Sequence, residues 1–272
     1  MNFQTLELQV KNGIGVVTLN RPDKLNAINH QMREELWEAV QKAEVDPEIS
    51  VLIFSANGRA FSAGGDLSFF EADWEDTSQF RREISFFTRT FDLLETMEKP
   101  VIAAINGICT GAGLQLTLSC DLRIASAKAE FAFLEKNIGL IPGAGGCSRL
   151  VKLVGYGKAK EMILLGEKIP ALRAYEMGLI NKVVPHEHLE KEVRHTAEAL
   201  LQKKTQATGL AKRILHSCVN SDFQTGRLME FLGQSILVKT SEHKEGIRAF
   251  REKRKSLSSQ EQLNKNQRGE KR

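Results

Sequence analysis

The sequence predicts an α/β protein in which sheets are covered by helices, followed by a helical C-terminal part. Short apolar strands alternate with helices over the first two-thirds of the chain, and loops that contain Gly or Pro separate them. After Pro185 the helical pattern is nearly continuous. Alternation of this kind implies sheets covered by helices rather than a helical bundle or a β-sandwich. A chain of 272 residues can form one large domain with a substantial core.

In chain order, the first elements are two strands joined at Asn12-Gly13, a dipeptide typical of β-hairpin turns. An apolar stripe with helical spacing follows and ends before Pro47. Pro100 opens a short apolar segment typical of a buried strand. The expected strands are Phe3–Val10, Ile14–Leu19, Val51–Ser55, Val101–Ile105, Leu122–Ala125 and Phe131–Phe133. The expected helices are Gln31–Ala43, Thr77–Met97, Gly111–Ser119, one from Cys147, Leu189–Lys203, Gln206–Asn220, Phe223–Leu237 and Lys244–Lys253.

The charge pattern distinguishes the body of the chain from its end. Residues 251–272 hold eight basic and three acidic side chains, so their net charge of +5 leaves −1 of the total of +4 for the rest. The body therefore lacks the basic surface typical of nucleic-acid binding, and we expect no specific nucleic-acid partner. We expect a core at residues 1–200, a helical region at 201–256 and a disordered basic tail at 257–272.

We expect a cytoplasmic protein that binds no membrane and no metal. The N-terminus has no apolar signal-peptide segment, and stretches such as Val101–Ile105 are too short to cross a bilayer. The cysteines show neither a C-x-x-C pair nor a zinc-finger spacing, so we expect reduced thiols. They are Cys109, Cys120, Cys147 and Cys218.

Two loops place small residues where backbone N–H groups could hold an oxyanion. They are Ala60–Asp66 and Asn106–Gly113, the second between a strand and a helix. A helix N-terminus leaves N–H donors unpaired, and one such donor contributes about 2.7–4 kcal/mol to an oxyanionic transition state. The glycines match neither a dinucleotide-binding fingerprint nor a P-loop. Each loop taken alone also fits an ordinary tight turn.

Several separated motifs resemble the crotonase superfamily, the family of enoyl-CoA hydratases and isomerases. They are NRPDKLNAI (20–28), AFSAGGDL (60–67), KPVIAAINGICTGAGLQL (99–116), SCDLRIAS (119–126), FLEKNIGLIPGAGG (133–146), ALRAYEMGLINKVVP (171–185) and GIRAFREKRK (246–255). The resemblance implies a crotonase-like spiral of ββα units with a C-terminal helical trimerisation region. It also implies an acyl-CoA substrate, no cofactor other than the coenzyme A of that substrate, and a homotrimer or homohexamer.

The resemblance also implies site residues. The oxyanion hole would be formed by the backbone N–H groups of Ala63 and Ala112. Hydratases carry glutamates at two positions, of which the second matches Glu135 and the first falls on Gln115. The residues expected to bind the thioester and coenzyme A are Lys24, Leu25, Ala63, Gly64, Gly65, Asp66, Gly111, Phe250 and Lys253, the last two across a subunit interface.

The amide at Gln115 leaves one catalytic carboxylate. Gln115 can hydrogen-bond a water molecule but cannot take its proton, so Glu135 is the expected acid/base. A single glutamate could hydrate a 2-enoyl thioester by passing the water's proton to the α-carbon, or isomerise a 3-enoyl to a 2-enoyl thioester. A lyase or an isomerase is therefore expected. Because Gln115 is neutral, only apolar burial could raise the pKa of Glu135.

Three other interpretations stay open. The chain could catalyse another reaction of this fold, such as thioester hydrolysis or decarboxylation. It could be a non-catalytic or RNA-binding member. A serine hydrolase at Ser62 is disfavoured because no G-x-S-x-G motif is present. The aromatic residues Phe69, Phe70, Trp74, Phe86, Phe87 and Phe91 either line a roomy acyl pocket or belong to the core.

Overall fold

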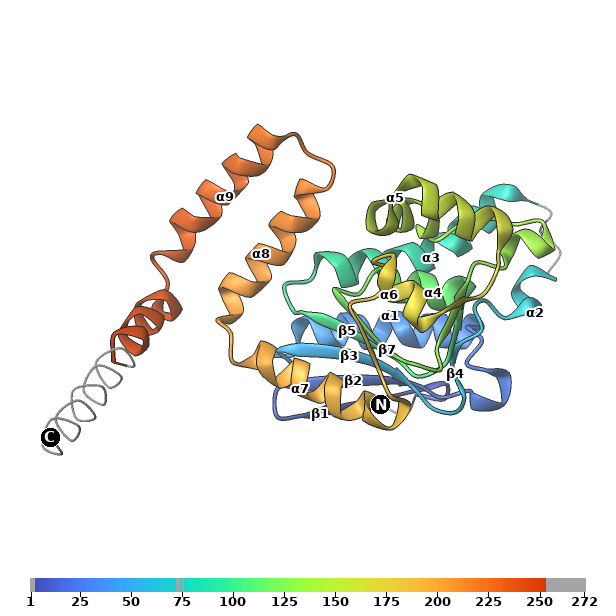
Figure 1. Ribbon diagram of the computed structural model, residues 1–272, viewed down its shortest axis with the longest axis horizontal. Coiled ribbons are helices and arrows are strands. Elements are labelled where there is room, and N and C mark those ends of the chain that lie inside the picture. The colour runs from blue at the N-terminus through green and yellow to red at the C-terminus, as the bar shows by residue number, and fades with distance from the viewer. Residues whose placement is uncertain (1–2, 72–73, 75, 253–272) are drawn as a thin grey trace, which may run out of the picture. The chain divides into compact units, whose positions relative to one another are not determined.

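The computed structural model describes residues 3–71, 74 and 76–252. The chain divides into two compact units, one up to Lys203 and one from Lys204 onward. The first unit combines sheets and helices and the second is helical (Figure 1). The predicted α/β class is confirmed. The proposed tail at 257–272 lies outside the described residues.

The main sheet of the first unit has six strands in the order β1-β2-β3-β5-β7-β10. The hairpin of β1 and β2 is antiparallel, and the later neighbours pair in parallel. Parallel neighbours need crossover connections, which here are the helices and the strands of a second sheet. The strands are β1 (Leu6–Lys11), β2 (Ile14–Leu19), β3 (Val51–Ala56), β5 (Val101–Ile105), β7 (Leu122–Ser126) and β10 (Lys182–Val184).

Alternating residues of the main sheet bury its two faces in different clusters. On β3, Leu52 and Phe54 belong to the larger core, whereas Val51 and Ile53 belong to the smaller one. This is the two-residue period of a strand buried on both faces. The smaller core is closed by α7 (Leu189–Leu201), whose Leu189, Val193 and Ala197 repeat every four residues. Figure 1 shows α7 on one side of the sheet. On the other side it shows α1 (His30–Val45), α3 (Thr77–Thr96), α4 (Gly111–Leu118) and α5 (Gly146–Leu165).

The second sheet corrects the sequence prediction in two places. It has the order β4-β6-β8-β9, and its strands are β4 (Ala60–Ser62), β6 (Ile108–Thr110), β8 (Glu130–Ala132) and β9 (Ile169–Pro170). The segments that contain β4 and β6 were expected to be loops. Three residues are too few to show an alternating pattern, so local sequence did not reveal them. Because β6 runs directly into α4 (Gly111–Leu118), the sheet fixes where that helix begins.

Side-chain caps define several helix starts in the first unit. Asn29 accepts the N–H of Met32 at the start of α1, and Asp66 and Asp76 cap α2 and α3. Besides α4 and α7, the helical elements of the first unit are η1 (Pro22–Lys24), α1 (His30–Val45), α2 (Leu67–Phe70), α3 (Thr77–Thr96), η2 (Glu135–Ile138), α5 (Gly146–Leu165), α6 (Ala171–Glu176) and η3 (His186–His188). Within the described ranges, no helix is both long and apolar enough to cross a membrane.

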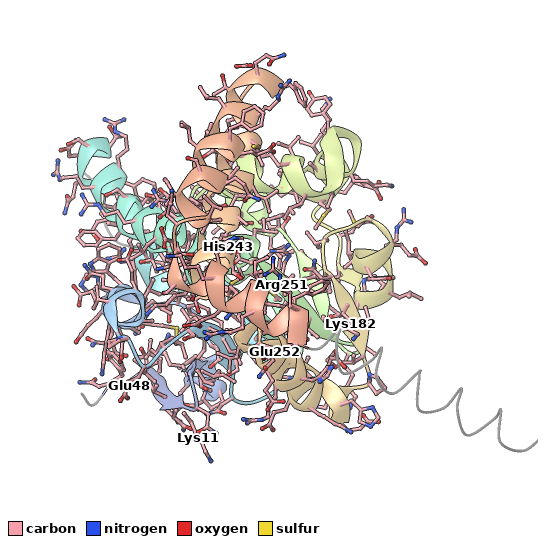
Figure 2. All side chains as sticks on the ribbon, turned by 90° about the vertical axis from the view of Figure 1, so that its left-hand side faces the viewer. Lys11, Glu48, Lys182, His243, Arg251 and Glu252 are labelled. Atoms are coloured by element: carbon pink, nitrogen blue, oxygen red, sulfur yellow. The ribbon has the colours of Figure 1, made fainter. Side chains whose placement is uncertain are left out.

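The described part of the second unit consists of α8 (Thr205–Cys218), α9 (Phe223–Leu237) and a helix at residues 241–252. Helices α8 and α9 pack on each other, and Asp222 caps α9 through the N–H groups of Gln224 and Thr225. Polar side chains such as His243, Arg251 and Glu252 are exposed on the last helix (Figure 2). Large apolar side chains are also exposed, namely Leu215, Val219, Phe223, Leu228, Phe231, Leu232, Ile236, Val238, Ile247 and Phe250.

Candidate active site

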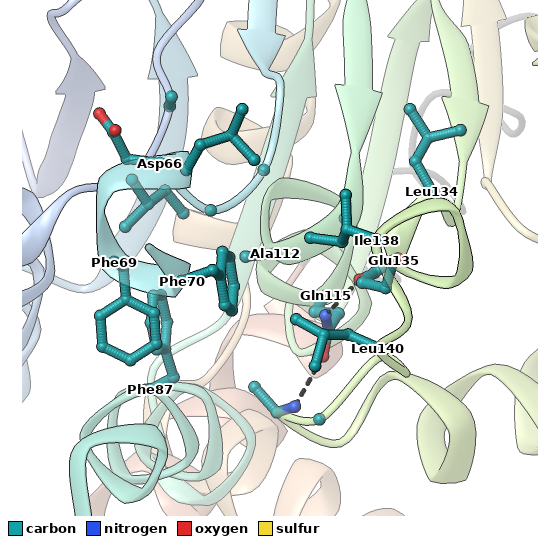
Figure 3. Close-up of a pocket in the computed structure, with 18 of the residues that line it drawn as sticks. Asp66, Phe69, Phe70, Phe87, Ala112, Gln115, Leu134, Glu135, Ile138 and Leu140 are labelled. Atoms are coloured by element: carbon teal, nitrogen blue, oxygen red, sulfur yellow. Dashed lines mark hydrogen bonds between the residues drawn. The ribbon is translucent and has the colours of Figure 1, made fainter. Parts of the chain in front are cut away.

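A mostly apolar cavity of about 770 Å³ opens in the first unit where the second sheet meets α4. Its walls come from the segment after β4, the N-terminus of α4, the turn η2 and the helices α2 and α3. Figure 3 shows the aromatic residues of α2 and α3 on one side and Glu135 on the other, with Ala112 between them. Segments far apart in the sequence therefore form one site. Of the residues expected from the sequence, Lys24, Ala63, Gly64, Gly65, Asp66, Gly111, Ala112, Gln115 and Glu135 line it.

A hydrogen-bonded network fixes the two side chains that matter most. The Oε1 atom of Gln115 accepts the N–H of Ala144 at 2.8 Å and that of Gly146 at 3.3 Å. With its oxygen occupied, Gln115 directs Nε2 to Oε1 of Glu135, 2.9 Å away (Figure 3). The Gln115 side chain is 3% exposed, so its amide is held inside the protein. Orientation of the amide therefore follows from these backbone donors.

Glu135 has one hydrogen-bonded oxygen and one free oxygen. Its Oε2 is buried and has no hydrogen-bond partner among the described residues. Burial raises the pKa of Glu135 above its ordinary value, against the lowering effect of the hydrogen bonds from backbone and Gln115. This agrees with the expectation that only an apolar environment could raise this pKa. A buried carboxylate with a free oxygen and a raised pKa is suited to proton transfer.

Backbone donors lie at the N-terminus of α4, one turn before Gln115 on the same helix. The first-turn N–H groups of α4, including that of Ala112, have no intrahelical acceptor, and the Thr110 side chain does not cap them. A Cβ atom added at Gly64 would lie 3.4 Å from the Ala112 nitrogen, so the segment after β4 runs against this helix end. A Cβ atom added at Gly111 would lie 3.6 Å from Oε1 of Glu135. Carboxylate and helix N-terminus therefore flank the same small space.

The structure corrects one of the two expected oxyanion donors. The N–H of Ala63 donates to the carbonyl oxygen of Leu25 at 2.9 Å and is not available to a substrate. Two residues further on, Gly65 forms a parallel bridge with Ile28, whose N–H and carbonyl bind Gly64 and Asp66. In a parallel bridge the N–H of the bridged residue points to the other side. The Gly65 N–H has no acceptor among the described residues and lies on the cavity wall.

Asp66 lines the cavity but does not offer a free carboxylate. It accepts a hydrogen bond from Arg21 at 2.9 Å and caps α2 through Ser68. Burial would raise its pKa, but the hydrogen bonds from Arg21 and Ser68 outweigh burial and lower it. Arg21 also donates to the Ala27 carbonyl. Asp66 is therefore an ionised structural group that holds the segment after Gly65.

The remaining predicted residues differ in their placement. Lys24 is exposed at the wall of the cavity. Leu25 is absent from the wall, and it contributes through its carbonyl, which holds Ala63. Phe250 is an exposed residue of the second unit, and Lys253 lies outside the described residues. The described residues contain no group of three or more His, Cys, Asp or Glu side chains that could hold a metal ion.

The aromatic residues divide between cavity and core. Phe69, Phe70 and Phe87 line the cavity, together with Phe80 and Ile84, which the sequence did not single out. Phe91 is fully buried in the core, and Trp74 packs against Phe69 and Phe80 outside the wall. Phe86 is partly exposed and lies over Arg33. The wall opposite Glu135 is therefore apolar and largely aromatic.

Fold and site together define a protein of the crotonase superfamily. The chain belongs to the enoyl-CoA hydratase/isomerase family, whose model matches residues 9–260. It is similar to a crotonyl-CoA hydratase of Syntrophomonas wolfei, with 35% identity over 94% of this chain and 98% of that protein. It is also similar to a short-chain-enoyl-CoA hydratase of Clostridium acetobutylicum, with 35% identity over 94% and 97%.

Solved structures with similar sequences have the same fold. The crystal structure of an enoyl-CoA hydratase from Bacillus anthracis superimposes with a TM-score of 0.87 at 35% identity, over 92% of this chain and 97% of that chain. The structure of Pseudomonas aeruginosa DspI also gives a TM-score of 0.87, at 31% identity over 92% and 94%. The crotonase-like architecture predicted from the motifs is confirmed.

Proposed function

We propose that this enzyme moves a proton on the carbons next to the thioester of an enoyl-CoA, with Glu135 as the single acid/base. The observation that carries the proposal is the Glu135 carboxyl, whose Oε2 is buried without a partner among the described residues and whose Oε1 lies near the N-terminus of α4. The N–H groups of Gly65 and Ala112 would hold the thioester oxygen as negative charge develops on it. A donor aimed at that oxygen stabilises the enolate more than the ground state.

Isomerisation is the reaction that one carboxylate completes by itself. The Glu135 carboxylate removes a proton from the α-carbon of a 3-enoyl thioester, and the electron pair enters a dienolate held by the two N–H groups. The resulting carboxylic acid returns the same proton to the γ-carbon, which leaves a 2-enoyl thioester. Gln115 takes no proton in this sequence, in keeping with its amide and with its three hydrogen bonds to the network.

Hydration of a 2-enoyl thioester is the second candidate, and the names of the similar hydratases favour it. In that reaction Glu135 takes a proton from water while the oxygen of water adds to the β-carbon. Glu135 then passes the proton to the α-carbon of the enolate. The same residue serves both reactions, and neither needs a cofactor beyond the coenzyme A of the substrate.

The cavity supports an acyl group longer than crotonyl. Its wall opposite Glu135 is built from Phe69, Phe70, Phe80, Ile84 and Phe87. Transfer of each methylene group from water to such a wall contributes about 0.8 kcal/mol. We therefore propose a medium-length or aromatic acyl chain. Lys24 and Arg81, the cationic residues on the wall, are suited to the phosphates of coenzyme A.

The second unit supports assembly with further copies of the chain. Phe223, Phe231 and Ile236 are 77%, 61% and 63% exposed, although residues of this kind are usually buried. Exposed apolar surface of this size is typical of a protein interface. We propose a homotrimer or a homohexamer, in agreement with the expectation from the motifs.

The experiment compares wild-type enzyme with Glu135→Gln on saturated, 2-enoyl, 3-enoyl and malonyl-type CoA thioesters in D₂O, with products identified by NMR. Wild type is expected to convert 3-enoyl or 2-enoyl substrates, and Glu135→Gln to lose about 10²–10⁴-fold in rate. Hydration places deuterium at the α-carbon and oxygen at the β-carbon, whereas isomerisation moves the substrate's own proton and adds no water. Thioester hydrolysis or decarboxylation as the main reaction, or full activity of Glu135→Gln, would contradict the proposal.

A further inference from the structure

Arg149 connects the outer face of the molecule to the active-site network. It lies in the first turn of α5, and its side chain is 10% exposed. Its Nη2 atom lies 2.6 Å from Oδ1 of Asp92 and 2.6 Å from Oε2 of Glu95, both on α3. Its Nη1 atom donates to the carbonyl oxygen of Ala144 at 2.9 Å. One guanidinium group thus joins α3 to the loop before α5.

Both backbone polar groups of Ala144 are hydrogen-bonded. Its carbonyl accepts from Arg149, and its N–H donates to Oε1 of Gln115 at 2.8 Å. The next residue, Gly145, has a φ of +86°, and a Cβ atom there would lie 2.1 Å from Nη1 of Arg149. Only glycine lets the guanidinium approach the loop this closely. The loop is therefore shaped around the cation.

We propose that Arg149 is a positioning residue, which acts through Ala144 to hold the Gln115 amide in the orientation that directs Nε2 to Glu135. The path runs from Asp92 and Glu95 through Arg149 and Ala144 to Gln115, and each step is a hydrogen bond or an ion pair. The proposal rests on the proposed catalytic role of Glu135. Arg149 itself does not line the cavity.

The Arg149 contact matters because the side-chain amide of Gln115 can flip, which exchanges the positions of its Oε1 and Nε2 atoms. If the Ala144 N–H moves away, Oε1 of Gln115 keeps only the longer hydrogen bond from Gly146, at 3.3 Å, and the two ends of the amide are distinguished less strongly. In the reversed orientation, Oε1 of Gln115 would face Oε1 of Glu135 and repel it. Two acidic groups on α3 hold the guanidinium, and the pKa of Arg149 is raised by their hydrogen bonds and charges despite burial. The cation is therefore permanent at working pH.

Loss of Arg149 is expected to move the titration of Glu135. The Gln115 N–H lowers the pKa of Glu135 in opposition to burial, so losing that donor raises the pKa further. Among the described titratable groups nearby, α5 contributes the Cys147 thiol, whose pKa is raised by burial and by the charge of Glu135. The Lys136 side chain is directed to Gly166, and α4 contributes the neutral Gln115 to this side.

The test measures pH profiles of kcat and kcat/KM for Arg149→Met and Arg149→Lys. Arg149→Met is expected to lower kcat about 10²-fold with little change in KM, because displacement of a catalytic group by about 1 Å has effects of this size. The acid limb of the pH profile of Arg149→Met should move to higher pH. Arg149→Lys should retain more of the wild-type kcat than Arg149→Met. Lys158→Met is the matched control, because its ion pair with Glu161 lies on the exposed side of the same helix.

A second arm asks whether Arg149 acts through Gln115. In a Gln115→Met background, Arg149→Met should shift the acid limb no further, because residues that act through one another are non-additive. A limb that stays at the wild-type pH in the folded Arg149→Met enzyme would overturn the proposal. So would equal, additive shifts in both backgrounds. If Glu135→Gln is inactive while these results are negative, the positioning role fails and the proposed function stands.

Discussion

The Nε2 atom of Gln115 lies 2.9 Å from Oε1 of Glu135, while Oε1 of Gln115 is occupied by two backbone N–H groups. Gln115 thus serves as a fixed donor to Glu135 and does not resemble a mobile polar group. Its oxygen has no remaining capacity to orient a water molecule, and only one of its N–H groups is left for that purpose. Acid/base chemistry in this cavity depends on Glu135.

Activity should fall at acid pH because the reaction begins with the ionised form of Glu135. Burial raises the pKa of Glu135 above 4.5, so kcat/KM should decrease as the pH falls through a value above 4.5. The measurement is a pH profile of kcat/KM, with the midpoint of thermal unfolding at each pH as a control for folding. An acid limb at or below pH 4.5 in folded protein would contradict the assignment.

Stability should respond to the same group in a defined direction. A pKa that is higher in the folded than in the unfolded chain means that the folded state binds the proton more tightly. Ionised Glu135 therefore lowers the free energy of unfolding as the pH rises from about 4.5 through the raised pKa. Urea unfolding across this range should show a smaller decrease for Glu135→Gln than for wild type.

Gln115→Glu should create a pair of carboxylates. One new oxygen would accept the Ala144 and Gly146 N–H groups, and the other would face Glu135 where Nε2 now lies. Two carboxylates at that separation share a proton, so the acid limb should move upward. The ratio of the hydration rate to the isomerisation rate should rise about 10²-fold, because the second carboxylate can act as a base on water. An unchanged product ratio would sink this idea; Gln115→Met is the control.

Gly65→Ala tests the donor that replaces Ala63. A Cβ atom at this position would lie 2.9 Å from the Phe70 ring, so either that ring or the segment that carries the Gly65 N–H must move. Loss of one oxyanion donor typically lowers kcat about 10²–10³-fold. Gly143→Ala is the matched control in the same cavity, because its Cβ atom would lie 3.7 Å from the Ile141 oxygen. Comparable kcat values for the two variants would argue against Gly65.

Gly113→Ala should destabilise the first unit. The added Cβ atom would lie 2.5 Å from Cβ of Ser62 and 2.7 Å from its Oγ, in the buried contact between α4 and β4. Overpacking of this kind costs about 1–3 kcal/mol, measured as a lower urea midpoint. Gly157→Ala in α5 meets no atom within 4 Å and should be neutral or stabilising by about 0.4–1 kcal/mol. Equal urea midpoints for Gly113→Ala and Gly157→Ala would show that the contact between α4 and β4 adjusts at little cost in stability.

Local patterns predicted what depends on neighbouring residues. The start of α4 near Gly111 follows from small residues after an apolar strand, and the helix between Thr77 and Thr96 follows from its apolar stripe. Glu135 was found through its motif. These features need no knowledge of distant contacts.

Features that depend on distant partners were not predicted. The Ala63 N–H is occupied by Leu25, and Gly65 was assigned to substrate contact without its role as a donor. The N–H groups that orient Gln115 come from residues 29 and 31 positions away. Strand β4 is three residues long and exists because β6 pairs with it. Register and hydrogen-bond direction are tertiary properties that no window of sequence contains.

Because Oε2 of Glu135 has no partner among the described residues, ligand binding should be coupled to uptake of a proton from the buffer. An acyl chain that fills the cavity displaces water from the space beside the Glu135 carboxyl and makes its ionised form still less favourable. An unreactive saturated thioester should therefore bind together with a hydrogen ion taken from solution. In isothermal titration calorimetry, the apparent enthalpy would then change with the ionisation enthalpy of the buffer, and affinity would weaken as the solution becomes alkaline.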